Sequence, residues 1–463
     1  MVALFINDNK DLDHIEREGI KVVKSKGWDW ENVTQSSWLK PTDCSKVTTK
    51  EIDFCHAAFS QIDITPDFQT SLVGCYRPDS RSQGVLHRLY AQVLLFQTGN
   101  KNFCLIAIDN LGLTVLLSNL LRSKIAAELN TDISHVMLNF SHTHSAPEPT
   151  PLAVNGERYF EFLCKQIVTC VKIAKKTFTP CKVGWALATS DIGDNRRDGC
   201  TITDNRLGAL MVADAESGKT IVIVTRIAAH ANVLMCENLK ISSDYIGIAR
   251  EELQVFYGCP IMVLQGASGN IKPIGVDKIG GGNLDDLHRV ANIFINDAKK
   301  LHFELEDIED ILMFSKEMVF ISDVPSKEEA EKIVADSGIE AEDWLLSCEE
   351  LRNKGDKTQS LKAEVNFFKL NQGCICGIAE EIFCELALDV QERTGNPLLF
   401  LNGYTNGCTG YLPSHAEWYK GGYEVYESYF YYHKYHGHIM PYRAETADQI
   451  TDLVVSEWER VKM

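Results

Sequence analysis

Residues 102–129 read NFCLIAIDNLGLTVLLSNLLRSKIAAEL, a continuous apolar run followed by a second segment whose apolar residues recur at helical spacing. The first part has the length and composition of a strand buried on both faces, and the second part predicts an amphipathic helix. The same order recurs at SHVMLNF (134–140) followed by YFEFLCKQIVTCVKIAKKT (159–177). This alternation predicts an α/β fold of layered mixed β-sheets flanked by helices.

The bulk composition is that of a globular protein with a large core. The chain has 463 residues, of which 45% are hydrophobic, and 46 Lys and Arg against 64 Asp and Glu give a net charge of −18. This charge repels nucleic-acid phosphates and anionic headgroups, so we expect neither nucleic-acid binding nor stable membrane association. The acidic start is a poor signal peptide, and no apolar run approaches the roughly 18 residues of a membrane span. We therefore expect a cytoplasmic protein.

Two parts of the chain differ in composition. Residues 1–50 are polar and irregular but contain three tryptophans, which predicts an extension that docks on the body or on a neighbouring subunit of a homo-oligomer. Residues 51–463 form the main domain, in which the acidic stretch 327–356 predicts solvated helices. The 15 cysteines are an odd number and favour reduced thiols, and the lone CxC of Cys374 and Cys376 favours core packing.

Several side chains with metal-binding chemistry follow predicted strands. His142 and His144 come after the strand HVMLNF, and His230 closes the run TIVIVTRIAAH. Glu381 starts the predicted helix EIFCELALDVQER, and Tyr411 lies in the loop after PLLFL. Ligands gather at the carboxyl ends of strands in open α/β sheets, so we expect these residues to converge. Two imidazoles, a carboxylate and a phenol suit Zn²⁺ with an open position for water.

Each candidate also has a structural alternative. A single histidine after a strand is more often a hydrogen-bonded core or loop residue, and Glu381 suits a helix N-terminus. Arg196 and Arg197 are typical of a solvent-exposed, ion-paired surface. Asp244 in ISSDYIG either caps the following helix, which is favoured, or orients a metal-bound histidine. The spacings exceed those of any local metal motif, so both interpretations stay open at this point.

Ten short motifs in register resemble the catalytic domain of the neutral/alkaline, non-lysosomal ceramidase family, and more closely its shorter bacterial members. They are QIDITPD, GVLHRLYAQVLLF, AIDNLGL, SHTHSAPEP, DNRR, AAHANVL, ISSDYIG, LQGASGNIKP, GIAEEIF and NGCTGYLPSHAEWYKGGYEV. The resemblance implies a zinc hydrolase whose metal is held by His142, His230, Glu381 and Tyr411. It places His144 beside the substrate rather than on the metal.

The resemblance implies further substrate contacts and also has departures. Arg196 and Tyr423 match an arginine and a tyrosine that contact substrate in the family. Lys272 stands where the family has a serine next to the proline, and AEE replaces the usual PGE, so Glu380 is an alternative to Glu381. Compared with the family, we expect neither the additional C-terminal domain after the GGYEV motif nor the secretion signal. Ceramide is therefore not the expected substrate.

The expected chemistry is hydrolysis of a small polar molecule. A zinc-activated water would attack the carbonyl of an amide, lactam, ester or lactone. His144 is the candidate general acid or base, and Arg196 and Lys272 would stabilise an oxyanion or hold a substrate carboxylate. Tyr423 would donate a hydrogen bond to the leaving group. The alternatives are a metal-dependent isomerase or lyase, a non-catalytic sensor on the same fold, and a non-haem iron enzyme.

The segment 423–440, YEVYESYFYYHKYHGHIM, is rich in tyrosine and histidine. It could line a pocket, form a subunit contact or bind a second metal through His433, His436 and His438. Aromatic enrichment favours the contact.

Overall fold

A mixed eight-stranded sheet is the centre of the computed structural model, which describes residues 47–48, 55–151, 153–277 and 281–462. Its strand order is β10-β9-β8-β6-β2-β3-β4-β5. The strands are β2 (Cys55–Asp63), β3 (Tyr90–Thr98), β4 (Lys101–Ile108), β5 (Val136–Phe140), β6 (Thr179–Thr189), β8 (Arg206–Asp214), β9 (Thr220–Ile227) and β10 (Ile261–Gln265). The pairs at the two edges, β4–β5 and β9–β10, are parallel, and the pairs between them are antiparallel.

The two edge strands of this sheet meet. The side-chain amide of Asn139 in β5 donates to the carbonyl oxygen of Gln265 in β10 at 3.1 Å, and its oxygen accepts from the Gln265 N–H at 2.8 Å. The sheet is thus curled, and the carboxyl ends of β5, β9 and β10 lie near one another. The loops that follow these strands carry the histidines discussed below.

A second, five-stranded sheet packs on the first, in the order β1-β12-β13-β14-β16. Its strands are β1 (Val47–Thr48), β12 (Asp310–Asp323), β13 (Thr358–Leu370), β14 (Gly373–Gly377) and β16 (Leu399–Asn402). Apolar side chains from the inner faces, among them Phe96, Leu210 and Phe368, fill the space between the two sheets.

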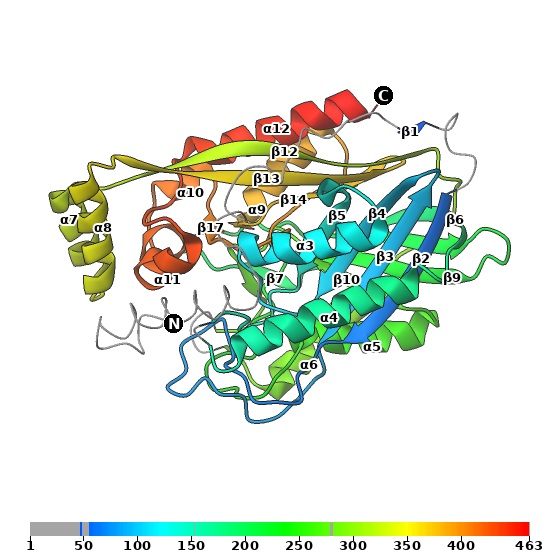
Figure 1. Ribbon diagram of the computed structural model, residues 1–463, viewed down its shortest axis with the longest axis horizontal. Helices are drawn as coiled ribbons and strands as arrows, with labels where there is room; N and C mark the ends of the chain where they lie inside the picture. The colour runs from blue at the N-terminus through cyan, green and yellow to red at the C-terminus, as the bar shows by residue number, and fades with distance from the viewer. Residues whose placement is uncertain (1–46, 49–54, 152, 278–280, 463) are drawn as a thin grey trace.

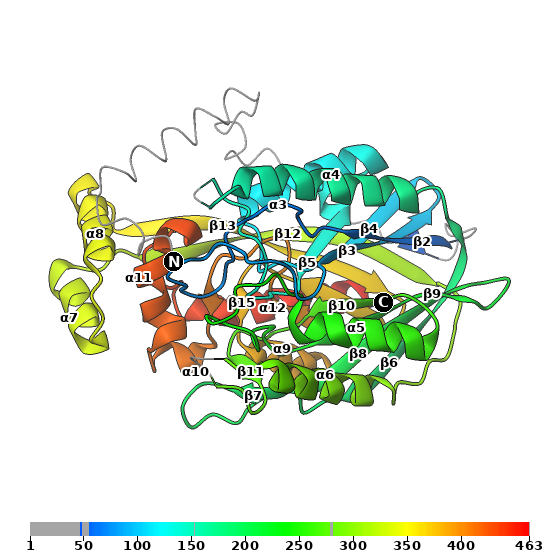
Figure 2. The same cartoon turned by 90° about the horizontal axis from the view of Figure 1, so that it is seen from below.

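Helices cover the outer faces of both sheets (Figures 1 and 2). The first sheet is covered by α3 (Val115–Leu129), α4 (Gly156–Ala174), α5 (Asp244–Tyr257) and α6 (Leu284–Ala298), and the second by α9 (Cys384–Thr394) and α12 (Glu445–Val461). The result is a helix–sheet–sheet–helix arrangement. The predicted α/β class with layered mixed sheets is confirmed.

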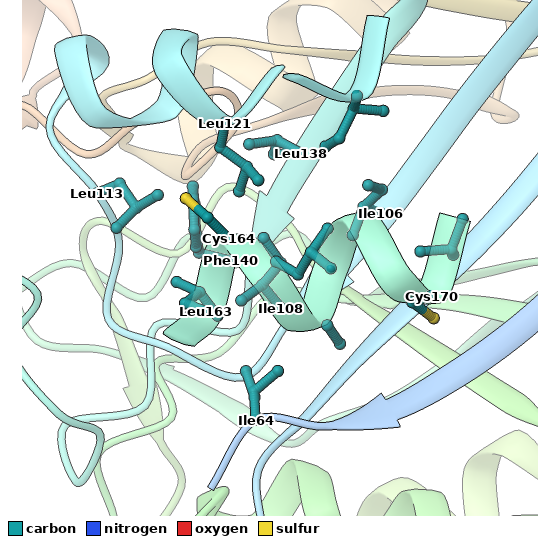
Figure 3. Packing of buried hydrophobic residues seen from close by; sticks show 14 of the residues in the cluster. Ile64, Ile106, Ile108, Leu113, Leu121, Leu138, Phe140, Leu163, Cys164 and Cys170 are labelled. Atoms are coloured by element: carbon teal, nitrogen blue, oxygen red, sulfur yellow. The ribbon is translucent and has the colours of Figure 1, made fainter. Parts of the chain in front are cut away.

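Figure 3 shows the core between α3, α4 and the first sheet. The Thr114 side chain accepts from the N–H of Leu117 and starts α3, and Leu121 and Leu163 bury their side chains against Ile106 and Leu138. Burial of each such side chain is worth about 1.5–3 kcal/mol. These contacts fix the ends of β4 and β5, from which the His142 loop departs.

Strands β12 and β13 extend beyond the sheet and carry α7 (Lys327–Ser337) and α8 (Glu342–Lys354) at one end of the molecule (Figure 1). These helices form the predicted acidic stretch, and α7 begins with a capping box between Ser326 and Glu329. Their apolar side packs on α11 (Ser428–His436), where the ring of Trp344 lies 5.0 Å from that of Phe430. Helices α7 and α8 thus pack against the tyrosine-rich segment 423–440.

The predicted extension at residues 1–50 lies outside the described residues apart from β1, so its docking stays a prediction. Every cysteine of the described part is a free thiol, and Cys374 and Cys376 are buried in β14 as expected of core residues. Among the described helices, none combines the length and hydropathy that a bilayer span requires.

Candidate metal centre

His142 occupies a strained backbone position directly after β5. Its φ of 59° lies in the left-handed region, which costs energy for any residue but glycine. The backbone N–H donates to the Asn110 carbonyl, and Nδ1 lies 2.7 Å from the carbonyl oxygen of Leu111. A carbonyl oxygen can only accept, so Nδ1 carries the proton and Nε2 presents a lone pair.

His230 is held in the same way after β9. Its Nδ1 lies 2.6 Å from the carbonyl oxygen of Ser268, which follows β10, and 3.2 Å from that of Ile271 in β11 (Ile271–Pro273). Burial, with the charge of Arg196, lowers the pKa of His230 to about 4. The imidazole is therefore neutral at pH 7, and its Nε2 also presents a lone pair.

Glu381 joins these two imidazoles. Its Oε2 lies 3.2 Å from Nε2 of His142 and 3.2 Å from Nε2 of His230. A carboxylate oxygen therefore faces two nitrogen lone pairs, an arrangement that repels unless a cation lies between them. Two ligand atoms of a tetrahedral zinc ion are about 3.4 Å apart, so the donor set fits such an ion.

A third imidazole completes the cluster. The ring of His144 lies 5.1 Å from that of His142 and 5.7 Å from that of His230, and one ligand atom from each of the three lies within 4.8 Å of the others. Neither ring nitrogen of His144 has a hydrogen-bond partner among the described residues. Burial and the two other histidines lower the pKa of His144 well below its usual value. It is a buried, neutral base with both nitrogens available.

Tyr411 is the neighbour of Glu381 on the next strand. It lies in β17 (Tyr411–Leu412), directly opposite Glu381 in β15 (Glu381–Ile382), and its hydroxyl accepts from Nη2 of Arg196 at 3.0 Å. The expectation that Glu381 starts a helix is wrong, because α9 begins at Cys384. Tyr423 packs beside Tyr411, with ring centroids 6.0 Å apart, and is 38% exposed. It is the solvent-facing member of the group.

Arg196 is neutralised by the protein itself. Its Nε lies 2.9 Å from Oε1 of Glu424, and its Nη2 also donates to the Gly269 carbonyl. Arg197 pairs with Glu424 and Glu417 at 3.0 Å each, and both arginine side chains are less than a tenth exposed. The alternative of a solvent-exposed arginine pair is therefore wrong. The two arginines instead tie the loop after β7 (Gly193–Asn195) to the π-helical turn Tyr423–Glu427.

Lys272 makes a different contact from the one expected. It lies opposite Asp194 in the antiparallel pair β7–β11, and its Nζ is 2.8 Å from Oδ2 of that aspartate. Glu380, the alternative to Glu381, accepts from the Thr409 hydroxyl at 3.0 Å. The carboxylate that contacts the two histidines is thus that of Glu381.

Asp244 supports the loop that follows His230. Its carboxylate accepts from the N–H groups of Val233 and Leu234, at 3.3 and 2.9 Å, and from that of Tyr245 at the start of α5. It therefore satisfies one N–H at the helix start and also fixes the loop behind the histidine. Within the described residues, it makes no hydrogen bond to a histidine ring nitrogen.

Tyr404 is a neighbour of the cluster that the sequence did not reveal. Its ring lies 4.4 Å from that of His142, and its hydroxyl accepts from Ser268 at 3.0 Å and donates to Oε2 of Glu381 at 3.5 Å. Its φ is 53°, another left-handed conformation at a bulky residue. The only sequence signal is its place in the Asn- and Gly-rich loop NGYTNG after PLLFL.

A second group of ligand atoms is already satisfied. Cys200, Glu385 and Glu417 approach within 4.8 Å of one another. Glu417 pairs with Arg197 and with Lys420, and Glu385 accepts from Asn270. This leaves the histidine cluster as the better cation site in the described part of the chain.

Comparison with solved structures identifies the architecture. The neutral ceramidase from Pseudomonas aeruginosa superposes with a TM-score of 0.64 at 16% identity, over 89% of this chain and 75% of that chain. The fold is ceramidase-like. A ceramidase complexed with C2 gives a TM-score of 0.65 at 15% identity, over 88% of this chain and 76% of that chain. No family model and no curated protein matches the sequence. The fold implied by the ten motifs is thus confirmed.

Proposed function

We propose that the chain is a zinc-dependent hydrolase that cleaves a carbonyl compound. The observation that supports this most is the approach of one carboxylate oxygen of Glu381 to Nε2 of both His142 and His230, at 3.2 Å each. Backbone carbonyls hold the opposite nitrogen of each ring, as is usual for metal-bound histidines. Tyr411 is proposed as the fourth ligand, because it lies opposite Glu381 in the β15–β17 pair.

The other residues of the site would position the substrate and transfer protons. When bound, a zinc ion supplies Lewis acidity, which polarises a carbonyl and lowers the pKa of water. His144 is neutral and has both nitrogens unpartnered, so it takes a proton from the attacking water and returns it to the leaving group. Arg196 holds the Tyr411 hydroxyl in place. Tyr423, at the exposed edge, donates a hydrogen bond to the substrate.

The substrate that fits this site is small, polar and uncharged. Arg196 is paired with Glu424 and Lys272 with Asp194, so neither guanidinium nor ammonium is left to balance a substrate carboxylate. Tyrosine hydroxyls suit a hydroxylated amide, lactam, ester or lactone. The ceramidase-like fold supports hydrolysis of a C–N bond. Ceramide itself is the substrate in the name of the P. aeruginosa enzyme, and we do not propose it for this chain.

Metal analysis and a substrate panel test the proposal together. Protein purified without added metal is expected to contain about one zinc per chain, and activity on neutral amides and lactones should disappear with a chelator and return with Zn²⁺. One iron per chain with no zinc would instead support the non-haem iron alternative. Zinc-loaded protein that is inactive on every carbonyl substrate would support the isomerase, lyase or sensor alternatives.

A further inference from the structure

Two cysteines outside the histidine cluster face each other across two loops. Cys75 lies in the loop after β2, and Cys236 lies in the loop that follows His230. Their side chains hydrogen-bond each other. Cys75 is buried, whereas Cys236 is partly exposed. The pair thus combines a thiol that a reagent can reach with a second thiol in contact behind it.

A buried arginine holds the two loops together. Arg77 is fully buried and donates to the carbonyl oxygens of Met235 at 3.1 Å, Asn238 at 2.9 Å and Cys75 at 3.5 Å. Its partners among the described residues are backbone carbonyls, and it is paired with no carboxylate there. A buried guanidinium without a carboxylate leaves a positive charge beside the thiols, which favours a thiolate.

The charge environment singles out Cys236 as the reactive member. The hydrogen bond from Cys75 lowers the pKa of Cys236 and the charge of Arg77 adds to the effect, which outweighs burial and the charge of Glu237. The same hydrogen bond raises the pKa of Cys75. Cys236 is therefore the nucleophile. Cys75 remains a protonated thiol until it reacts with the oxidised sulfur of Cys236.

A second thiol pair provides an internal contrast. Cys55 and Cys181 also hydrogen-bond each other, but both are buried, and the nearby carboxylate of Asp214 disfavours a thiolate at Cys181. Neither thiol of this pair is exposed. Both pairs have two thiols in contact. Cys75 and Cys236 differ from Cys55 and Cys181 in the exposure of one thiol and in the positive charge of Arg77.

We propose that Cys75 and Cys236 are an oxidation site that hydrogen peroxide converts into a disulfide. The thiolate of Cys236 attacks the peroxide, the O–O bond breaks, and the leaving oxygen departs as water after protonation, which leaves a sulfenic acid. The thiol of Cys75 then attacks that sulfur, the S–O bond breaks, and a second water leaves. Overall, two thiols lose two electrons and two protons to one peroxide. A dithiol reverses the step by exchange.

The disulfide would tie together the loops that contact His144. Arg77 donates to the His144 carbonyl at 2.9 Å, and a Cβ placed on Gly74 would lie 2.7 Å from Cγ of the His144 ring. Oxidation at this site therefore acts on the backbone that carries this histidine. The inference does not depend on the proposed hydrolase activity, because the bond itself is measured.

The test is peptide mapping of the full chain after limited treatment with hydrogen peroxide. We expect a disulfide-linked pair of peptides containing Cys75 and Cys236, about 2 Da lighter than the reduced pair, which dithiothreitol restores. Alkylation of Cys236 before peroxide treatment should be at least about tenfold faster than that of Cys181.

Variants decide the outcome. Cys75→Ser should leave Cys236 oxidised to a sulfenic acid that a dimedone probe traps, whereas Cys236→Ser should abolish oxidation of Cys75. Cys181→Ser is the matched control and should still form the Cys75–Cys236 bond. The proposal is overturned if the linked peptides are absent from the parent chain, or if Cys55–Cys181 forms as readily. Thermal unfolding of each reduced variant shows whether the fold is kept.

Discussion

Glu381 lies directly opposite Tyr411 in the short parallel pair β15–β17. Residues in register on neighbouring strands present their side chains on the same face. The carboxylate and the phenol thus lie on the same face of this pair, although they come from loops after two different strands, β14 and β16. Arg196 then fixes the position of the phenol through its hydroxyl.

The first prediction uses adjacent glutamates. Glu381→Gln should lower zinc affinity by at least about 100-fold, because an amide replaces the charged oxygen between two imidazoles. Glu380→Gln should retain the metal, because its partner is Thr409. Zinc content after dialysis against a weak chelator measures both. Equal loss in the two variants would mean that the register of the ligand has been misassigned.

The second prediction concerns Tyr404. Tyr404→Phe should keep the fold and bind zinc, but activity should fall by roughly tenfold because the hydrogen bond to Glu381 is lost. Tyr257→Phe removes a hydroxyl that donates to the Ala298 carbonyl between α5 and α6, and it should leave kcat/KM unchanged. Steady-state kinetics on the best substrate compares the two. Unchanged kinetics for Tyr404→Phe would show that its ring, not its hydroxyl, matters.

The third prediction separates two cations. Arg196→Met should reduce kcat/KM by about 100-fold, since it frees the Tyr411 hydroxyl and leaves Glu424 with one arginine. Lys272→Met removes a largely independent ion pair with Asp194 and should change kcat/KM by less than about threefold. A loss of about 100-fold for Lys272→Met would restore the oxyanion role expected from the sequence.

The fourth prediction concerns acid stability at a site away from the cluster. Burial lowers the pKa of His135 to about 4, while its value in the unfolded chain is about 6.5. The unfolded state therefore binds the proton more tightly, and the free energy of unfolding falls as pH drops from about 6.5 to 4. His135→Asn removes this term, so its stability should depend less steeply on pH in that window, by up to about 1.4 kcal/mol per unit.

Urea denaturation at pH 7, 6, 5 and 4 gives the comparison for His135→Asn. Asparagine retains a polar group near Thr131, whose hydroxyl lies 2.9 Å from Nδ1 of His135. Parallel stability curves for the two proteins would contradict the prediction.

The sequence predicts the elements of this fold better than its special positions. The apolar run and helix at 102–129 correspond to β4 and α3, because burial on both faces and helical spacing are local properties. The placement of His142 and His230 after strands follows from the same signals. Their meeting was expected from the carboxyl ends of strands in open sheets, but the way it comes about, through a first sheet that curls so that β5 touches β10, was not.

The remaining differences have nonlocal causes. Lys272 was expected beside the substrate, but the β7–β11 register places it opposite Asp194. A short sequence motif cannot show which residue lies opposite on the neighbouring strand. Tyr404 was missed because its role depends on a left-handed backbone in a loop, a conformation that its residue type does not indicate. Glu381 lies in a two-residue strand, too short to give a periodic signal.

The carbonyl oxygens of Leu111 and Ser268 already orient the imidazoles of His142 and His230 within the folded chain. The donor atoms are therefore preorganised, and the ion need not gather them from a flexible ensemble. The apo form of a zinc finger unfolds. This protein, in contrast, should stay folded when a chelator removes the metal, and it should bind metal again when the ion is added back. Exchange of one divalent ion for another should then be governed by coordination preference alone, without refolding.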